Sequence, residues 1–262
     1  MANNIIDHFN KYFEMVPAIS DELKNEVYKL RYQVLCIEYE YLNTQEYPDG
    51  VEFDDFDQHS VHYLIRHRKS GHYAATVRLI LPDANHREKL FPLEEYCKID
   101  NFAVMQSINR EHLGEVSRFC VSKAFKKRKN EASSLVAIDS DRQENFTLNE
   151  KRAFPLISLA LIACCIKASY ENNIHYTYGT MEPQLFRFVS SFGINFIKIG
   201  PLAEYHGKRW PAVIKVADML DCVAESNMDI WNFLTNKGCF CPARPIEKSN
   251  PLRRNSRASQ HW

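Results

Sequence analysis

A long apolar stretch restricts the fold more than any other feature of this chain. It runs for 13 residues from Phe154 to Ile166 and contains Pro155 and Ser158. A helix that crosses a bilayer needs about 20 consecutive apolar residues, so this stretch is too short to span a membrane. We therefore predict a helix from about Phe154 to Tyr170, with Pro155 in its first turn, buried inside a folded domain.

Strand-like segments lie on both sides of this helix in the sequence. Apolar patterns bounded by turn residues predict strands at Ser60–Arg66, Tyr73–Leu81, Glu115–Val121, His175–Thr180, Asn195–Ile199 and Ala212–Val216. Two further helices are predicted, at Ser20–Leu35 with Ser20 as the N-cap and at Glu182–Phe192 ended by Gly193. This order of elements predicts an α/β fold in which helices cover one sheet.

Bulk composition narrows the functional classes. The 33 basic and 33 acidic residues cancel, which argues against general nucleic-acid binding. Only 8 residues are glycine, where average usage would give roughly 18. The sequence contains no Walker-type or dinucleotide-type glycine loop, so a ligand phosphate would need another kind of site.

No secretory signal is recognised at the N-terminus. The eight sparsely placed cysteines indicate a reducing, cytoplasmic compartment.

Charged residues are unevenly distributed along the chain. The segment Glu38–Asp57 holds eight acidic residues and no basic one, whereas Lys123–Lys129 holds five basic residues in seven. Between Arg244 and Arg257 there are five basic residues and one acidic residue, among prolines and serines. We therefore expect one domain over residues 1–243 and a basic, flexible tail over residues 244–262, which is compatible with peripheral membrane contact.

Arg78 lies inside the apolar strand Tyr73–Leu81. An arginine is seldom buried without an acidic partner, so Arg78 either faces solvent or meets an acid. The nearest supply is the acidic loop that contains Asp54 and Asp57. This loop lacks the residue spacing of a calcium-binding EF-hand loop, and on composition alone it is a solvated acidic segment.

The segment Glu115–Phe119 combines an acid, a hydroxyl and a base within one predicted strand. Strict alternation would place Glu115, Ser117 and Phe119 on one face, and Arg118 on the other face with Val116 and Cys120. Glu115 is a candidate catalytic base. Cys120 could be proposed as a nucleophile, but its apolar neighbours favour a position in the core.

Taken together, four short motifs resemble the acyl-homoserine-lactone synthases of quorum sensing and their relatives, the N-acyl amino acid synthases. The resemblance covers about Ser20–Val216, and its strength lies in the order and spacing of motifs that are individually weak. The matching residues are Leu30-Arg31-Tyr32-x-Val34, Glu52-x-Asp54-x-x-Asp57 followed by His62-Tyr63-Leu64, Val77-Arg78-Leu79, and Glu115-x-Ser117-Arg118-Phe119. The resemblance implies a GNAT-like fold, that of the acyl-CoA N-acyltransferases, with a mixed central sheet flanked by helices. The insertion Lys126–Arg152 and the basic tail most resemble the acyltransferases associated with PEP-CTERM/exosortase systems.

The resemblance also implies an activity, the transfer of a fatty acyl group from a carrier-protein thioester to the amino group of an amino acid. Aminolysis of a thioester needs a proton acceptor, for which Glu115 is the choice, and donors to the developing oxyanion, expected from backbone N–H groups near Phe119–Val121. Arg118 and Phe119 are expected beside Glu115 in the catalytic centre. The resemblance also implies one ionic network next to it, formed by Arg31, Asp54, Asp57, Arg78 and Arg118, which binds the amino and carboxylate groups of the acceptor or fixes the loop over it. The residues expected to bind substrate are Arg31, Asp54, Asp57, Arg78 and Ser117. A structural network that closes a lid is the alternative for any single member.

The donor-binding segment departs from the pattern of CoA-dependent relatives, which hold the pyrophosphate in an [RQ]-x-x-G-x-[GA] loop. No glycine occurs between Gly114 and Gly179, and basic residues stand where that loop would be. We therefore expect Lys123, Lys126, Lys127, Arg128 and Lys129 to dock an acidic acyl carrier protein, with acyl-CoA as the alternative donor. A basic patch for RNA or lipid, and a solvated patch without a partner, are the competing interpretations.

Other features of the sequence favour neither a cofactor nor a metal. Cys239-x-Cys241 has no second ligand pair at metal-binding spacing, so we expect no metal site there.

Two alternative functions stay open at this point. One is an acyl-homoserine-lactone synthase that uses S-adenosylmethionine as acceptor, and the other is a non-catalytic GNAT-like binding module.

Overall fold

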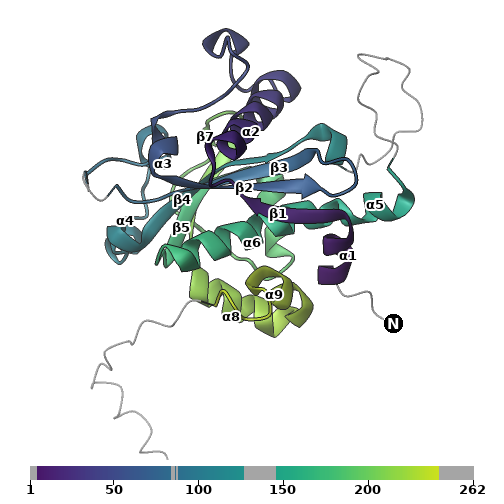
Figure 1. Cartoon of the computed structure of the whole chain (residues 1–262). Helices are drawn as coiled ribbons and strands as arrows, with labels where there is room; N and C mark the ends of the chain where they lie inside the picture. Colours follow the sequence, from purple (N-terminus) through teal and green to yellow (C-terminus); the bar gives the residue numbers. More distant parts are fainter. Residues whose placement is uncertain (1–4, 84–85, 87, 127–145, 242–262) are drawn as a thin grey trace, which may run out of the picture.

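A computed structural model describes residues 5–83, 86, 88–126 and 146–241. Its centre is a mixed sheet of eight strands in the order β1-β2-β3-β4-β5-β8-β6, with β7 paired to β8 (Figure 1). Neighbours from β1 to β4 are antiparallel, β4 and β5 are parallel, and β8 is antiparallel to β5. The strands are β1 Phe13–Pro17, β2 Ser60–His67, β3 Tyr73–Ile80, β4 Leu113–Val121, β5 Tyr176–Met181, β6 Ile197–Lys198, β7 Ala203–Glu204 and β8 Lys208–Lys215.

Helices cover both faces of the sheet. Figure 1 shows α2 on one face and α6, α8 and α9 on the other. The α-helices are α1 Ile5–Tyr12, α2 Asp21–Tyr32, α3 Pro92–Tyr96, α4 Phe102–Gln106, α5 Leu148–Ala153, α6 Pro155–Glu171, α7 Pro183–Ser190, α8 Val216–Ser226 and α9 Met228–Thr235. The short helical segments are η1 Gln33–Glu38, η2 Thr44–Glu46, η3 Asp55–His59, η4 Arg110–His112 and η5 Lys123–Phe125. The predicted mixed sheet flanked by helices is therefore confirmed.

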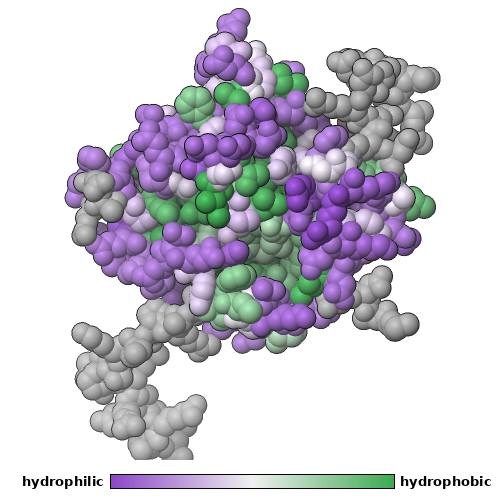
Figure 2. Space-filling model, viewed as in Figure 1, coloured by the Kyte–Doolittle hydropathy of each residue, from purple (hydrophilic) through white to green (hydrophobic). Residues whose placement is uncertain are grey.

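The apolar stretch forms α6, as predicted, and most of its residues are buried against the sheet and α9. Pro155 stands in its first turn. In the described part of the chain, no helix is long and apolar enough to cross a membrane. Figure 2 shows hydrophilic residues over most of one face of the molecule, with apolar side chains gathered near its centre.

Strand β4 breaks the alternation that the sequence predicted. Arg78 pairs with Ser117 but Thr76 pairs with Cys120, so two residues of β4 stand opposite Val77 alone. Arg118 has a φ of 50°, in the left-handed region, and forms part of this β-bulge. The prediction that Ser117 and Arg118 lie on opposite faces is therefore wrong, because the bulge turns both side chains toward the α2 face.

The same bulge separates Phe119 from Glu115 and Ser117. Phe119 packs against the core on the α6 side, together with Val116. Cys120 packs instead with residues of α2. The predicted grouping of Glu115, Ser117 and Phe119 on one face, and of Val116 with Cys120 on the other, is therefore wrong as well.

Strands β4 and β5 pair over only three residues of each strand, ending at Glu115 opposite Tyr178. Beyond this point β4 runs on to Val121 with no strand of the described chain on its β5 side. Gly179 keeps the two strands close where they part, because a Cβ there would lie 2.5 Å from the carbonyl oxygen of Val116. This opening in the sheet is where the candidate site lies. The tail 244–262 and most of the insertion Lys126–Arg152 lie outside the described residues, so the predicted domain boundary stays a prediction.

Candidate active site

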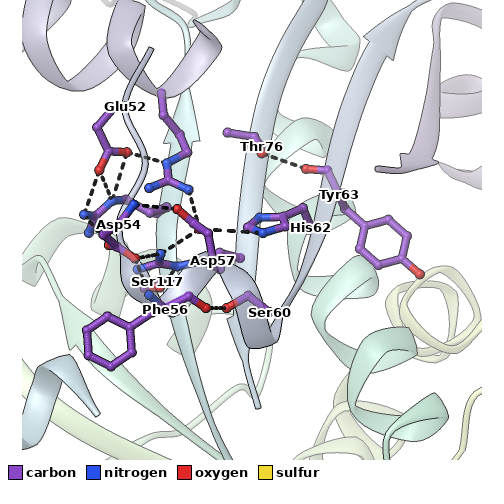
Figure 3. A network of polar contacts seen from close by, with 12 residues as sticks. Glu52, Asp54, Phe56, Asp57, Ser60, His62, Tyr63, Thr76 and Ser117 are labelled. Carbon is purple, nitrogen blue, oxygen red and sulfur yellow. Dashed lines mark hydrogen bonds and ion pairs between the residues drawn. The ribbon is translucent and has the colours of Figure 1, made fainter. Parts of the chain in front are cut away.

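Six charged side chains form one ionic network on the α2 face of the sheet (Figure 3). Arg31 donates through Nε to Glu52 and through Nη1 to Asp57 Oδ1 at 2.7 Å. Asp57 Oδ1 also lies 2.8 Å from Arg78 Nη1. Arg118 Nη2 lies 2.8 Å from Glu52 Oε1 and 3.0 Å from Asp54 Oδ2. The predicted meeting of these arginines with the acidic loop is therefore confirmed.

Hydrogen bonds within the acidic loop hold Asp54 and Asp57 in place. Asp54 caps η3 by accepting from Phe56 N at 3.0 Å, and Asp57 Oδ2 accepts from Asp54 N at 2.8 Å, which makes a reciprocal capping box. Burial alone would raise the pKa of Glu52, but the guanidinium groups of Arg31 and Arg118 outweigh it and lower this pKa to about 2. The pKa of Asp57 is lowered for the same reason by Arg31 and Arg78.

A vestibule of about 220 Å³ opens beside β4, where β4 and β5 part. Glu115, Ser117, Arg118 and Phe119 line it, whereas Arg31, Asp54, Asp57 and Arg78 do not. Of these four, only Asp54 keeps an exposed fraction of side chain above a few per cent, at 27%. Their predicted role in substrate binding therefore has no support from the cavity. The network instead holds Ser117, through Arg78 Nε at 2.9 Å, and Arg118 at the vestibule wall.

A second cavity of about 90 Å³ lies against α6, α7 and β5 and is lined mostly by apolar side chains. Val116, Phe119, Thr180 and Leu185 line both cavities. These four residues therefore form the junction between a polar vestibule and an apolar cavity.

Glu115 lies at the vestibule wall and is almost completely buried. Its Oε2 accepts a hydrogen bond from Leu93 N at 2.9 Å. Burial raises its pKa to about 8, although the Leu93 N–H and the charge of Arg78 pull in the opposite direction. A carboxyl group with a pKa close to neutral suits general base catalysis. Cys120 also borders the vestibule, but burial raises the pKa of its thiol to about 12, which disfavours a nucleophilic thiolate.

The described part of the basic patch lies at one edge of the vestibule. Lys126 lines the vestibule and donates to Tyr39 Oη at 2.6 Å. Lys123 is held by Glu38 through its backbone N–H, at 2.7 Å, and through its ammonium group. Both ammonium groups lie over the Tyr39 ring. Lys127, Arg128 and Lys129 lie outside the described residues.

The sequence interpretation missed several residues of the site. Glu52 stands in a quoted motif but was not expected as a site residue, although it contacts both Arg31 and Arg118. Glu182, Tyr205, His206 and Arg209 also line the vestibule. The last three belong to the β7–β8 hairpin, which has no strong strand pattern. Gly207 was the one available signal of a turn there.

Comparisons with known proteins bear on the fold of the chain. Residues 30–135 match the family model of the acetyltransferase (GNAT) domain. No curated protein sequence matches the chain. The similar solved structures include those of the AHL synthase LasI, of FeeM, an N-acyl amino acid synthase from uncultured soil microbes, and of BjaI, a CoA-dependent acyl-homoserine lactone synthase, with SAM and isopentyl-CoA.

All three structures have a TM-score of 0.51 with this chain. Sequence identity is 15% for LasI, 14% for FeeM and 16% for BjaI. Each match covers 82% of this chain, and 94%, 97% and 88% of the respective structures. The likeness establishes the GNAT-like fold, and the domain match supports an acyltransferase.

Proposed function

We propose that this chain is an N-acyltransferase that moves a fatty acyl group from an acyl carrier protein thioester to the amino group of an amino acid. The observation that carries the proposal is the parting of β4 and β5 beside two adjoining cavities, one polar and one apolar. An acyl thioester has the same two parts, because its alkyl chain is apolar and its carbonyl carbon reacts with a polar nucleophile.

In the proposed reaction the two cavities, the β4 backbone and Glu115 have separate roles. The acyl chain would occupy the apolar cavity, with the thioester carbonyl at the junction near Phe119. Backbone N–H groups of β4 that no strand of the described chain pairs would donate to the oxyanion. Glu115, as carboxylate, would accept the proton that the amino group loses as its nitrogen attacks the carbonyl carbon. The carbon–sulfur bond then breaks, and the carrier sulfur leaves as a thiol by taking up the proton that Glu115 accepted, which restores the carboxylate.

Arg118 sits between the ionic network and the vestibule, with its side chain 17% exposed. Its charge is balanced by Glu52 and Asp54, so it would orient polar groups in the vestibule without leaving an unpaired charge there. No cofactor is needed for this chemistry. We extend the proposal to a cytoplasmic location, on the sparse cysteines, and to an association with PEP-CTERM/exosortase systems, on the sequence resemblance.

The donor is tested by reversing the charge of the basic patch. The variant Lys126→Glu/Lys127→Glu/Arg128→Glu should raise the KM for acyl carrier protein by about 10-fold or more and flatten its dependence on salt. Lys69→Glu, in the exposed β2–β3 turn, is the matched control. An unchanged KM would rule out docking through this patch, and an equal loss with acyl-CoA would favour the alternative donor.

The acceptor is tested by mass spectrometry of lipid extracts from cells that express the protein. N-acyl amino acids that disappear with Glu115→Gln would support the proposal. Acyl-homoserine lactones instead would favour the alternative, a synthase that uses S-adenosylmethionine as acceptor. The absence of any new acylated amine would favour a non-catalytic GNAT-like binding module.

A further inference from the structure

The arginines of the ionic network are poorly placed to bind the carboxylate of an incoming acceptor. The side chains of Arg31 and Arg78 are fully buried and do not line the vestibule. Their Nη2 atoms form no hydrogen bond but are enclosed with the rest of the side chain. Arg118 reaches the vestibule, but Glu52 and Asp54 already share its guanidinium group. A cation held by fewer carboxylates at the vestibule wall is therefore better placed for an acceptor carboxylate.

Arg209, on β8, supplies another guanidinium group at the wall of the vestibule. Its Nη2 lies 3.1 Å from Glu182 Oε1, and its Nε donates to His206 O at 3.2 Å. Its guanidinium carbon lies 5.6 Å from the centre of the Tyr41 ring. In the described part of the chain Nη1 has no hydrogen-bond partner. One face of the group and its Nε and Nη2 atoms are thus engaged, and Nη1 remains for a ligand.

The hairpin that carries Arg209 is held in a strained conformation at the vestibule. His206 has a φ of 49° and Gly207 a φ of 93°, and Tyr205 N donates to Gly207 O at 3.0 Å across the turn. His206 Nδ1 lies 3.2 Å from Tyr41 O, which ties the hairpin to the segment after η1. A non-glycine residue in the left-handed region costs about 1–3 kcal/mol, and such strain concentrates at ligand sites.

We propose that Arg209 binds the carboxylate of the acceptor and thereby selects amines that bear a free carboxylate. This inference rests on the proposed N-acyl transfer and deepens it. Arg209 and Glu115 line the same vestibule, so one small acceptor can place its carboxylate on the first and its amino group beside the second. Glu182 is 44% exposed, so it can release Nη2 to the ligand carboxylate at little cost.

The test compares amino acids with their decarboxylated amines, for example L-tyrosine with tyramine and L-phenylalanine with phenethylamine. Acyl transfer is followed by release of the donor thiol and by mass spectrometry of the product. For the wild-type protein we expect kcat/KM to favour the amino acid by about 10- to 100-fold. This factor corresponds to the free energy of hydrogen bonds to a charged group. In Arg209→Met this ratio should fall to near one, mainly through a higher KM for the amino acid.

Two further variants separate a binding role from a structural one. Arg187→Met removes an exposed arginine of α7 and should keep the wild-type ratio. Glu182→Gln removes the competing carboxylate and should lower the KM for the amino acid several-fold. An unchanged ratio in Arg209→Met, or an equal loss with both acceptors, would overturn the inference while leaving the acyltransferase intact. A wild-type protein that acylates none of the common amino acids or their amines would overturn the proposed function as well.

Discussion

At the scale of single residues, the raised pKa of Glu115 makes the reaction depend on pH. Its pKa of about 8 means that most molecules carry a protonated Glu115 at neutral pH. Because the base must be ionised, kcat/KM should rise with pH and level off above about 8. Glu115→Gln should lower kcat by about 10²- to 10⁴-fold and remove this inflection, which a pH series of initial rates would reveal.

Glu95→Gln is the matched control for this prediction, since Glu95 is an exposed acid on the same helix as Leu93. It should keep both the rate and the inflection. A Glu115→Gln enzyme that retains the wild-type pH profile would exclude Glu115 as the proton acceptor.

The second prediction at this scale concerns Glu52, which pairs with both Arg31 and Arg118. Glu52→Gln leaves two buried guanidinium groups without this counter-charge, so it should lower the free energy of unfolding by about 3–5 kcal/mol. Urea denaturation measures this loss. The exposed Glu46→Gln in η2 should stay within about 0.5 kcal/mol of the wild type. A similar small change for Glu52 would mean that the network contributes little to stability.

Sequence reasoning predicted most of this network through the family resemblance, whereas the residues alone showed only that Arg78, inside an apolar strand, either faces solvent or meets an acid. It missed Glu52, since nothing in the sequence indicates that one carboxylate lies between two arginines. It also misplaced Arg118 and Phe119. The bulge in β4 depends on pairing with β3. Its positive φ falls on Arg118, so no glycine in the sequence indicates it.

At the scale of elements, α7 contributes Leu185 to the junction between the vestibule and the apolar cavity. Leu185 lines both, so Leu185→Trp should narrow the junction and lower kcat/KM for long acyl donors about 10-fold or more relative to short ones. Gln184→Trp places the same side chain on the exposed side of α7 and should leave chain-length preference unchanged. Equal effects on all donors would place the acyl chain elsewhere.

The elements that form the sheet's centre were predicted to within a few residues, because β2, β3 and β4 are strongly apolar. The elements missed are β1 at an edge of the sheet, the two-residue strand β7, and helices such as α8 and α9, which follow the last predicted strand. Strand β8 begins four residues before the predicted Ala212, which left Arg209 outside any expected element. Part of the vestibule therefore lay in a segment that local pattern does not identify.

At the scale of the whole molecule, three buried groups with shifted pKa values act on stability over different pH ranges. Glu52, with its pKa lowered from 4.5 to about 2, contributes stability above pH 4.5 that is lost as the pH falls toward 2. Burial lowers the pKa of His62 from 6.5 to about 4, so stability falls as the pH drops through that range. Glu115, with its pKa raised from 4.5 to about 8, favours the folded state at low pH, and this contribution is lost as the pH rises toward 8.

These opposing contributions predict the shape of the stability curve. Between pH 4.5 and 6.5 the effects of His62 and Glu115 oppose each other, each with a slope of up to about 1.4 kcal/mol per pH unit, so stability should change little. Above pH 6.5 only Glu115 among the three still titrates, and stability should decline until about pH 8. In Glu115→Gln, whose amide mimics the protonated acid, this decline should vanish and stability should instead rise up to pH 6.5. Urea denaturation of both proteins from pH 3 to 9 provides the measurement, and two parallel curves would show that Glu115 ionises as freely in the folded protein as in the unfolded chain.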